Sequence, residues 1–319
     1  MALIRIANNM YRIVPEFSFT IQTTGASELY TNQGWFDSGS PFLSVDWGDD
    51  SGVEVFTTGT VSHTYDTADT YNVKFIKSID FNPSFDTDLN LISVDSAFAP
   101  LNNNGGSIFV NYMFDGCVNL VSVPSDLFSK NLGITKLSNV FSNCTALKSI
   151  PVGIFNGITG AIEAKSTFKG CTLLTSIPST LFASCSLIEP FFNCFDGCIN
   201  ITSIPSGLFA NNTSALRFND VFKNNYALTS IPSGLFDNNV NTINFGSAFE
   251  GCDGITSIPS GLFDNNTAVI SYPRTFYGCT ALGGNAPALW DLVPEPDGTD
   301  CFFNCTGLTN YASIPVDWK

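Results

Sequence analysis

Ten cysteines are the first residues to consider for chemistry in this chain, because most of them recur at a regular spacing. Seven of them share one position of a repeating pattern: Cys117, Cys144, Cys171, Cys198, Cys252, Cys279 and Cys305. Stacked copies would lie within disulfide range, but their side chains should point in parallel, and Asn225 occupies the same position. We expect a column of buried thiols, because disulfide frameworks belong to small domains that lack a core. The Cys194–Cys198 and Cys301–Cys305 spacings are weak signals for zinc, since the chain has one histidine and no matching second pair nearby.

His63 is that histidine, and any Ser-His-Asp or Cys-His site would have to use it. The chain contains no G-x-S-x-G, P-loop, G-x-G-x-x-G or H-E-x-x-H motif. We expect a structural role for His63, no catalytic residue and no cofactor. A glycan depolymerase would need paired carboxylates; the repeat interior has none, and the outer face is left open.

Asp46, Asp49 and Asp50 form the one cluster that resembles a hard-cation site. The alternative is a turn in which Asp side chains accept hydrogen bonds from backbone amides. We favour the turn, because the spacing does not match an EF-hand loop. No metal is therefore predicted, and calcium at these three residues is the alternative.

The composition excludes several classes of partner. The chain has 319 residues and a formal net charge of -15. An acidic surface repels nucleic acid and anionic lipid, so we expect neither as a partner. No run approaches the roughly 18 apolar residues of a membrane helix. The opening MALIRIANNMYRIVPEF lacks the pattern of a secretory signal peptide, and we expect residues 1–14 to be an attachment segment.

The elements that position these residues come from a repeat of 27 residues. Its clearest marker is a series of phenylalanines: Phe114, Phe141, Phe168, Phe195, Phe222, Phe249 and Phe276. Cys or Asn follows three residues later, Leu or Ile three after that, and then S-[VI]-P in six coils. Such a pattern predicts a solenoid over 83–319, with degenerate caps at 85–98 and 283–319.

Within each coil the sequence predicts two short strands and two helical turns. The first strand is Leu-Thr-Ser-Ile-Pro, since the residue before proline avoids the α conformation. The second is clearest at Leu216–Phe218, Ile243–Phe245 and Ile270–Tyr272, where two apolar residues would point inward around one outward residue. The residue two before each Phe is Asn, Ser or Asp in five of six coils, and Arg274 in the other. We expect it to be the N-cap of a helical turn.

Residues 15–82 alternate apolar and polar side chains, which predicts a small β-domain. Its Val45–Ser51 (VDWGDDS), His63-Thr64-Tyr65-Asp66 and Thr70–Val73 (TYNV) segments resemble the polycystic-kidney-disease (PKD) type of immunoglobulin-like domain. Asp50 and Asp69 stand where that family usually has glycine. The resemblance implies an extracellular-type β-sandwich that acts as a spacer and sometimes binds ligands.

The coils, with F-x-x-C-x-x-L-T-S-I-P, resemble the BspA-like leucine-rich repeats, whose family implies adhesion and surface display. Asn310–Pro315 and the final Trp-Lys resemble the C-termini of prophage-encoded, tail-associated repeat proteins. The expected fold is thus a small N-terminal β-sandwich followed by a leucine-rich-repeat-like α/β solenoid.

The coils differ most on one row of outward residues, whereas Thr175, Thr202, Thr229 and Thr256 repeat on another row. Solenoids commonly bind over a sheet face whose side chains vary between repeats. The candidate binding residues are Lys136, Glu163, Phe191, Phe192, Arg217, Asn219, Asn244, Ser271 and Arg274. The Phe191–Phe192 pair would be an aromatic anchor. The alternative is that these positions are merely unconstrained.

Together these features predict a non-enzymatic binding or display protein, most simply a phage virion-associated fibre that contacts a host glycan or protein. Residues 1–14 would attach it to other virion proteins. A structural decoration protein without a receptor and a bacterial surface adhesin are the alternatives. Homo-oligomerisation is left open.

Overall fold

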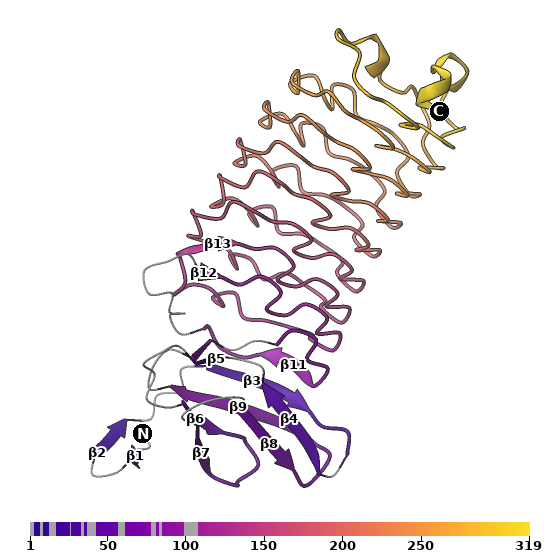
Figure 1. Ribbon diagram of the computed structural model, residues 1–319. Coiled ribbons are helices and arrows are strands. Elements are labelled where there is room, and N and C mark those ends of the chain that lie inside the picture. Colours follow the sequence, from indigo (N-terminus) through magenta and orange to yellow (C-terminus); the bar gives the residue numbers. More distant parts are fainter. Residues whose placement is uncertain are drawn as a thin grey trace.

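The computed structural model describes residues 3–6, 9–12, 17–25, 27–32, 35–36, 43–56, 61–77, 81–82, 85–98 and 108–319. A group of β-sheets forms the N-terminal end, and stacked coils rise from it to the C-terminus (Figure 1). Its strands are β1 (Leu3–Ile6), β2 (Asn9–Arg12), β3 (Phe17–Gln22), β4 (Glu28–Asn32), β5 (Trp35–Phe36), β6 (Leu43–Asp46), β7 (Val53–Phe56), β8 (Val61–Tyr65), β9 (Thr70–Lys77), β10 (Phe81–Asn82) and β11 (Leu91–Val94).

The largest of these sheets has five strands in the order β11-β3-β9-β6-β7, all antiparallel. Smaller antiparallel pairs are β1-β2, β4-β8 and β10-β5. Alternation explains β3, because Phe17, Phe19 and Ile21 are buried on one face. Tyr30 of β4 packs against Phe19 of β3 and against Trp47, so β4-β8 and the large sheet share a core. The assignment of this region to the PKD family stays a prediction.

Strand β11 joins the head to the solenoid. It lies in the first, degenerate copy of the repeat and pairs with β3, where Val94 lies opposite Phe19. Ser93 of the same strand forms a parallel bridge with Ser122 of the next coil. Phe17 also stacks on Phe98, with ring centroids 4.5 Å apart. Strand β11 is therefore both an edge of the head sheet and part of the first layer of stacked coils.

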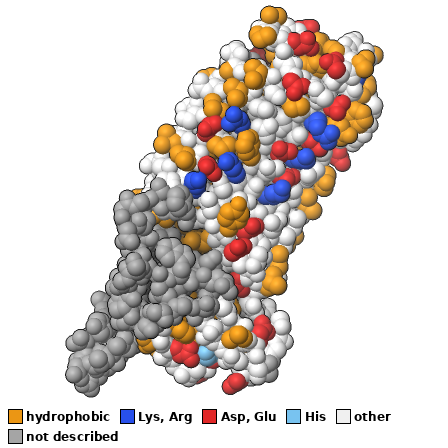
Figure 2. Space-filling view, viewed as in Figure 1, with side chains coloured by type: hydrophobic (Ala, Val, Ile, Leu, Met, Phe, Trp, Pro, Cys, Tyr) orange, Lys and Arg blue, Asp and Glu red, His pale blue; other side chains and the backbone are white. Residues whose placement is uncertain are grey.

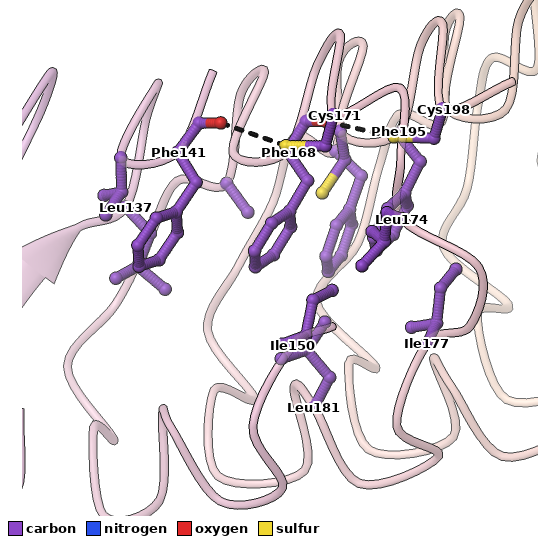
Figure 3. Packing of buried hydrophobic residues seen from close by; sticks show 14 of the residues in the cluster. Leu137, Phe141, Ile150, Phe168, Cys171, Leu174, Ile177, Leu181, Phe195 and Cys198 are labelled. Carbon is purple, nitrogen blue, oxygen red and sulfur yellow. Dashed lines mark hydrogen bonds between the residues drawn. The ribbon is translucent and has the colours of Figure 1, made fainter. Parts of the chain in front are cut away.

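Contacts between interior side chains, rather than long strands, hold neighbouring coils of the solenoid together. Strands β12 (Ile108–Phe109) and β13 (Ile134–Lys136) pair in parallel, and later coils meet at single-residue parallel bridges. The repeat phenylalanines from Phe114 to Phe302 stack at centroid distances between 5.3 and 5.8 Å. Figure 3 shows part of this column, with Phe141, Phe168 and Phe195 in a row. Each coil thus buries its apolar face against its neighbours.

Where the sequence predicted helical turns, the coils have hydrogen-bonded turns that do not form a helix. That prediction was wrong for the coils. Short 3-10 helices appear among the described residues only at the C-terminal cap: η1 (Leu289–Asp291), η2 (Tyr311–Ser313) and η3 (Val316–Trp318). The expected N-cap residues instead have left-handed φ angles, for example 57° at Asn139, 52° at Ser166 and 56° at Arg274. Asn tolerates this conformation, but Arg does not favour it, so the coil geometry overrides local preference.

Candidate binding face

The face predicted from the second strand is organised by two adjacent rows. We call these two rows, together with the half-exposed Phe192, Asn219 and Arg274 that follow them, the ladder face. The bridging row comprises Lys136, Glu163, Pro190, Arg217, Asn244 and Ser271, and it forms most of the parallel bridges between coils. The row before it comprises Ile162, Glu189, Leu216, Ile243 and Ile270, and each of its amides donates to the carbonyl of the previous coil. These backbone hydrogen bonds run without interruption from Thr135 to Asp297 and give the face a rigid backbone.

Apolar side chains on the row before the bridges are exposed or half-exposed, which corrects the expected inward pair. Ile162 is 45% exposed and Ile270 is 62% exposed, whereas Phe245 and Tyr272, which follow the bridges, are buried. The pattern predicted burial from residue type alone. The chain reaches the interior only after the bridging residue, so one member of each pair stays outside.

Charged side chains on the ladder face are paired with each other. The Glu163 carboxylate lies 3.5 Å from both Lys136 Nζ and Lys165 Nζ. Partial burial raises the pKa of Glu163, but the two ammonium groups and a hydrogen bond from Ser138 more than offset this and lower it overall. Arg217 Nη1 lies 3.1 Å from Glu189 Oε1, with both side chains largely open to solvent. Figure 2 shows such basic and acidic side chains interspersed with apolar ones along the solenoid.

Arg274 is held by the molecule itself. Its guanidinium donates to both carboxylate oxygens of Glu250, at 2.6 and 3.0 Å, and stacks 3.7 Å from the centre of the Tyr277 ring. Lys223 Nζ lies 3.4 Å from the same carboxylate. The carboxylate of Glu250 is mostly buried, so these cations neutralise a charge that would otherwise be costly. Arg274 therefore supports the stack and offers less to a partner than Arg217.

The polar and aromatic candidates divide between surface and core. Asn219 Nδ2 donates to Asn244 Oδ1 at 2.9 Å, and that oxygen also accepts from the Gly246 amide. Ser271 and Phe192 are half-exposed. Phe191 is fully buried between Phe182, Phe209 and Phe218, so its prediction as part of a surface anchor was wrong. The face retains eight of the nine predicted residues.

The aspartate cluster of the head is occupied by turn contacts. Asp46 accepts from the Gly48 amide and pairs with Lys74. Asp49 accepts from the amide and hydroxyl of Ser51. Asp50 has a left-handed φ of 61°. Within the described ranges, no three His, Cys, Asp or Glu side chains are placed to hold a metal ion.

His63 locks the same turn to the core. Its ring stacks on Trp47 at 4.9 Å, and Nε2 lies 2.7 Å from Asp49 Oδ2. Trp47 in turn donates to Glu54, and Tyr65 donates to the Trp47 carbonyl. These contacts give His63 a packing and hydrogen-bonding role in the β-domain.

All ten cysteines are free and buried. In the shared position, each thiol donates to the backbone carbonyl of a Phe in the preceding coil, as Cys171 does to Phe141 at 3.1 Å (Figure 3). Asn225 replaces the thiol with an amide that donates to the Phe195 carbonyl at 2.8 Å. Burial raises the pKa of Cys171 and Cys198 well above the usual range, so they stay protonated and unreactive.

A second interior column went unnoticed in the sequence. Asn212, Asn239 and Asn266 are buried at one corner, and each Nδ2 donates to two carbonyls of the preceding coil. Asn239, for example, donates to Phe209 and Asn212 at 3.1 and 2.9 Å. The 27-residue spacing of these asparagines is visible in the sequence, but asparagine is usually exposed in turns, so the spacing does not predict that they are buried. In the part of the chain that the structure describes, no helix is long and apolar enough to cross a membrane.

Comparisons with known proteins give structural similarity alone. No family model and no curated protein matches the chain. Among solved structures, a leucine-rich cell surface protein from Faecalibacterium prausnitzii A2-165 is 14% identical, with a TM-score of 0.29 over 86% of this chain and 93% of its own. A chain of the Drosophila Toll–Spatzle complex is 16% identical, with a TM-score of 0.24 over 70% of this chain and 38% of its own. A chain of the TLR13–ssRNA13 complex is 13% identical, with a TM-score of 0.20 over 63% and 44%. The description of this chain as a leucine-rich-repeat-like solenoid rests on its own coil geometry.

Proposed function

We propose that this chain is a non-enzymatic binding protein that contacts its partner through the ladder face. The observation that carries the proposal is the contrast between a repeated backbone and a bridging row whose residue type changes at every coil and whose side chains, except the buried Pro190, are half-exposed. Hydrogen bonds between coils hold these side chains at fixed spacing, so little ordering entropy is lost on binding. Solenoids of this kind bind extended partners over such a surface.

The chemistry of the face favours a host-surface glycan or protein. Ile162, Ile243 and Ile270 supply apolar area, while Arg217 and Asn244 supply hydrogen-bonding groups beside it. The net charge of -15 disfavours nucleic acid and anionic membranes. This mixture suits a partner that is neither strongly anionic nor wholly apolar.

The finer proposal is a phage virion protein whose residues 1–14 attach to other virion proteins. It is supported by the resemblance of Asn310–Pro315 and the terminal Trp-Lys to tail-associated proteins. Within 1–14 the structure describes the β1-β2 hairpin, and the side chains there lie outside the described residues. A bacterial adhesin would use the same face, and a decoration protein would use none. The boundaries 15–82 and 83–319 stay proposals in the same sense.

Binding of the purified protein to cells of candidate bacterial hosts tests the face directly. We expect saturable binding that weakens at least about tenfold, roughly 1.4 kcal/mol, in an Arg217→Ala, Phe192→Ala double variant. The matched control is Thr202→Ala, Thr229→Ala on the repeated threonine row, which should bind as the parent does. Loss in the threonine variant alone would move the site to that row. No saturable binding by the parent would overturn receptor recognition for those hosts and favour the decoration protein.

A further inference from the structure

The asparagine column ends before the solenoid does, and its end coincides with a cavity. The same position is occupied in successive coils by Asn131, Ile158, Cys185, Asn212, Asn239 and Asn266, all at most 3% exposed. The next residue in this series is Val293, which is 96% exposed. Every earlier coil therefore fills the corner of its predecessor with a side chain, and the last coil leaves that place empty.

Two backbone carbonyl groups line this unfilled corner. In the preceding coils, the equivalent two carbonyls both accept a hydrogen bond from one asparagine side chain. In the preceding coils a single Asn Nδ2 bonds the carbonyl of the corner Phe and that of the corner residue three positions later. The equivalent pair here is Phe263 and Asn266. Among the described residues, these two carbonyls accept only from turn amides of their own coil, those of Asn266 and Val269. The buried Oδ1 of Asn266 also lacks a donor.

The cavity at this corner measures about 390 Å³ and is walled by the last regular coil and by residues 287–294. Leu262, Phe263, Val269 and Leu289 are its buried apolar residues, and the exposed Leu292 and Pro294 also line it. Asp264 and Thr267 are exposed and also line it. A pocket of this size is within the range that encloses small molecules.

We propose that this cavity binds a small molecule that carries a primary amide or primary amine on an apolar body. A nitrogen with two hydrogens is required to bond both carbonyls at once, as the asparagine amides do in the preceding coils. A secondary amide has one hydrogen and could donate to only one of the two carbonyls, so it would lose one hydrogen bond of the pair. The carboxylate of Asp264 adds an attraction for the ammonium form of an amine.

Ligand-observed saturation-transfer NMR on the full chain tests the proposal at the millimolar affinities expected for small probes. The probes are valeramide, n-pentylamine and N-methylvaleramide, which share an apolar tail and differ in their N–H groups. We expect the first two to bind and N-methylvaleramide to bind at least about tenfold more weakly, since it can form only one of the two hydrogen bonds. Tighter binding of pentylamine than valeramide would identify the amine as the preferred class, and the reverse would identify the amide.

A matched pair of variants tests whether the probes bind in this cavity. Thr267→Trp should fill the cavity and abolish binding of both probes, whereas Val240→Trp, at the same position one coil earlier, should leave it unchanged. Circular dichroism melting of both variants checks that they fold. Equal binding of the three probes would overturn the proposal, because apolar burial alone would then explain it. Binding that survives Thr267→Trp would overturn it as well. The variants that test the ladder face do not line this cavity, which shares only Ile270 with that face, so the two proposals can fail separately.

Discussion

The interior columns and the ladder face arise from one repeat but obey different constraints. Inside, each position meets its own copy 27 residues away, so Phe stacks on Phe and each thiol bonds the same kind of carbonyl. Outside, each position is fixed by a backbone bridge while its side chain meets solvent, so Lys136, Arg217 and Ser271 can occupy one row. Inside the solenoid, therefore, residue types that repeat from coil to coil indicate packing. On the ladder face, residue types that change from coil to coil indicate a surface available to a partner.

The sharpest way to break that comparison uses two adjacent residues. Phe191→Ala removes a ring packed against three others and should lower the free energy of unfolding by about 3–5 kcal/mol. Phe192→Ala removes a half-exposed ring and should cost less than about 1 kcal/mol. Urea unfolding followed by circular dichroism gives both values. Equal losses would mean that Phe192 belongs to the interior and not to the ladder face.

The same pair shows what the sequence could and could not predict. The spacing of Phe and Cys was sufficient to predict the Phe and Cys columns, because these inward positions repeat their residue type at nearly every coil. Spacing could not tell Phe191 from Phe192, since their orientation depends on where the chain turns after the bridge. The burial of Ile270 was predicted wrongly for the same reason, because an apolar residue in a short strand was taken to be buried.

Local preference was ambiguous where one residue type suits two conformations. Asn139 and Ser166 are good N-caps, but asparagine is also common with left-handed φ, and the coil uses that second option. The column of Asn212, Asn239 and Asn266 depends on how neighbouring coils align, which the sequence of one coil does not contain. The empty corner at Val293 depends in addition on the path of residues 287–294.

A smaller difference in stability is expected between substitutions in the two interior columns. Asn239→Ala leaves the carbonyls of Phe209 and Asn212 without their amide donor and should cost about 1–3 kcal/mol. Asn225→Cys instead restores the thiol found at most copies of its position and should change stability by less than about 1 kcal/mol. Chemical unfolding of the two variants at the same pH gives the comparison. A neutral Asn239→Ala would show that the corner amides contribute little to holding the coils together.

The smallest expected effect concerns the charges that border the ladder face, and it depends on pH. Burial raises the pKa of Glu250, but hydrogen bonds from Arg274 and Ser247 and the charges of Lys223 and Arg274 lower it overall from 4.5. A carboxyl whose pKa is depressed by folding stabilises the protein above its unfolded value, and that contribution is lost as the pH falls through the folded value. Arg274→Gln should therefore cost about 1 kcal/mol or less at pH 7, because the arginine is partly solvated.

The difference between Arg274→Gln and the parent should shrink as the pH falls below 4.5, when Glu250 becomes protonated in both proteins. Denaturant midpoints measured between pH 7 and pH 3 follow it. Arg217→Gln is the matched surface control, since its partner Glu189 is 45% exposed and their pair should contribute less at every pH. A pH-independent loss in Arg274→Gln would assign its effect to stacking on Tyr277 rather than to charge, and would make Arg274 an extension of the interior columns.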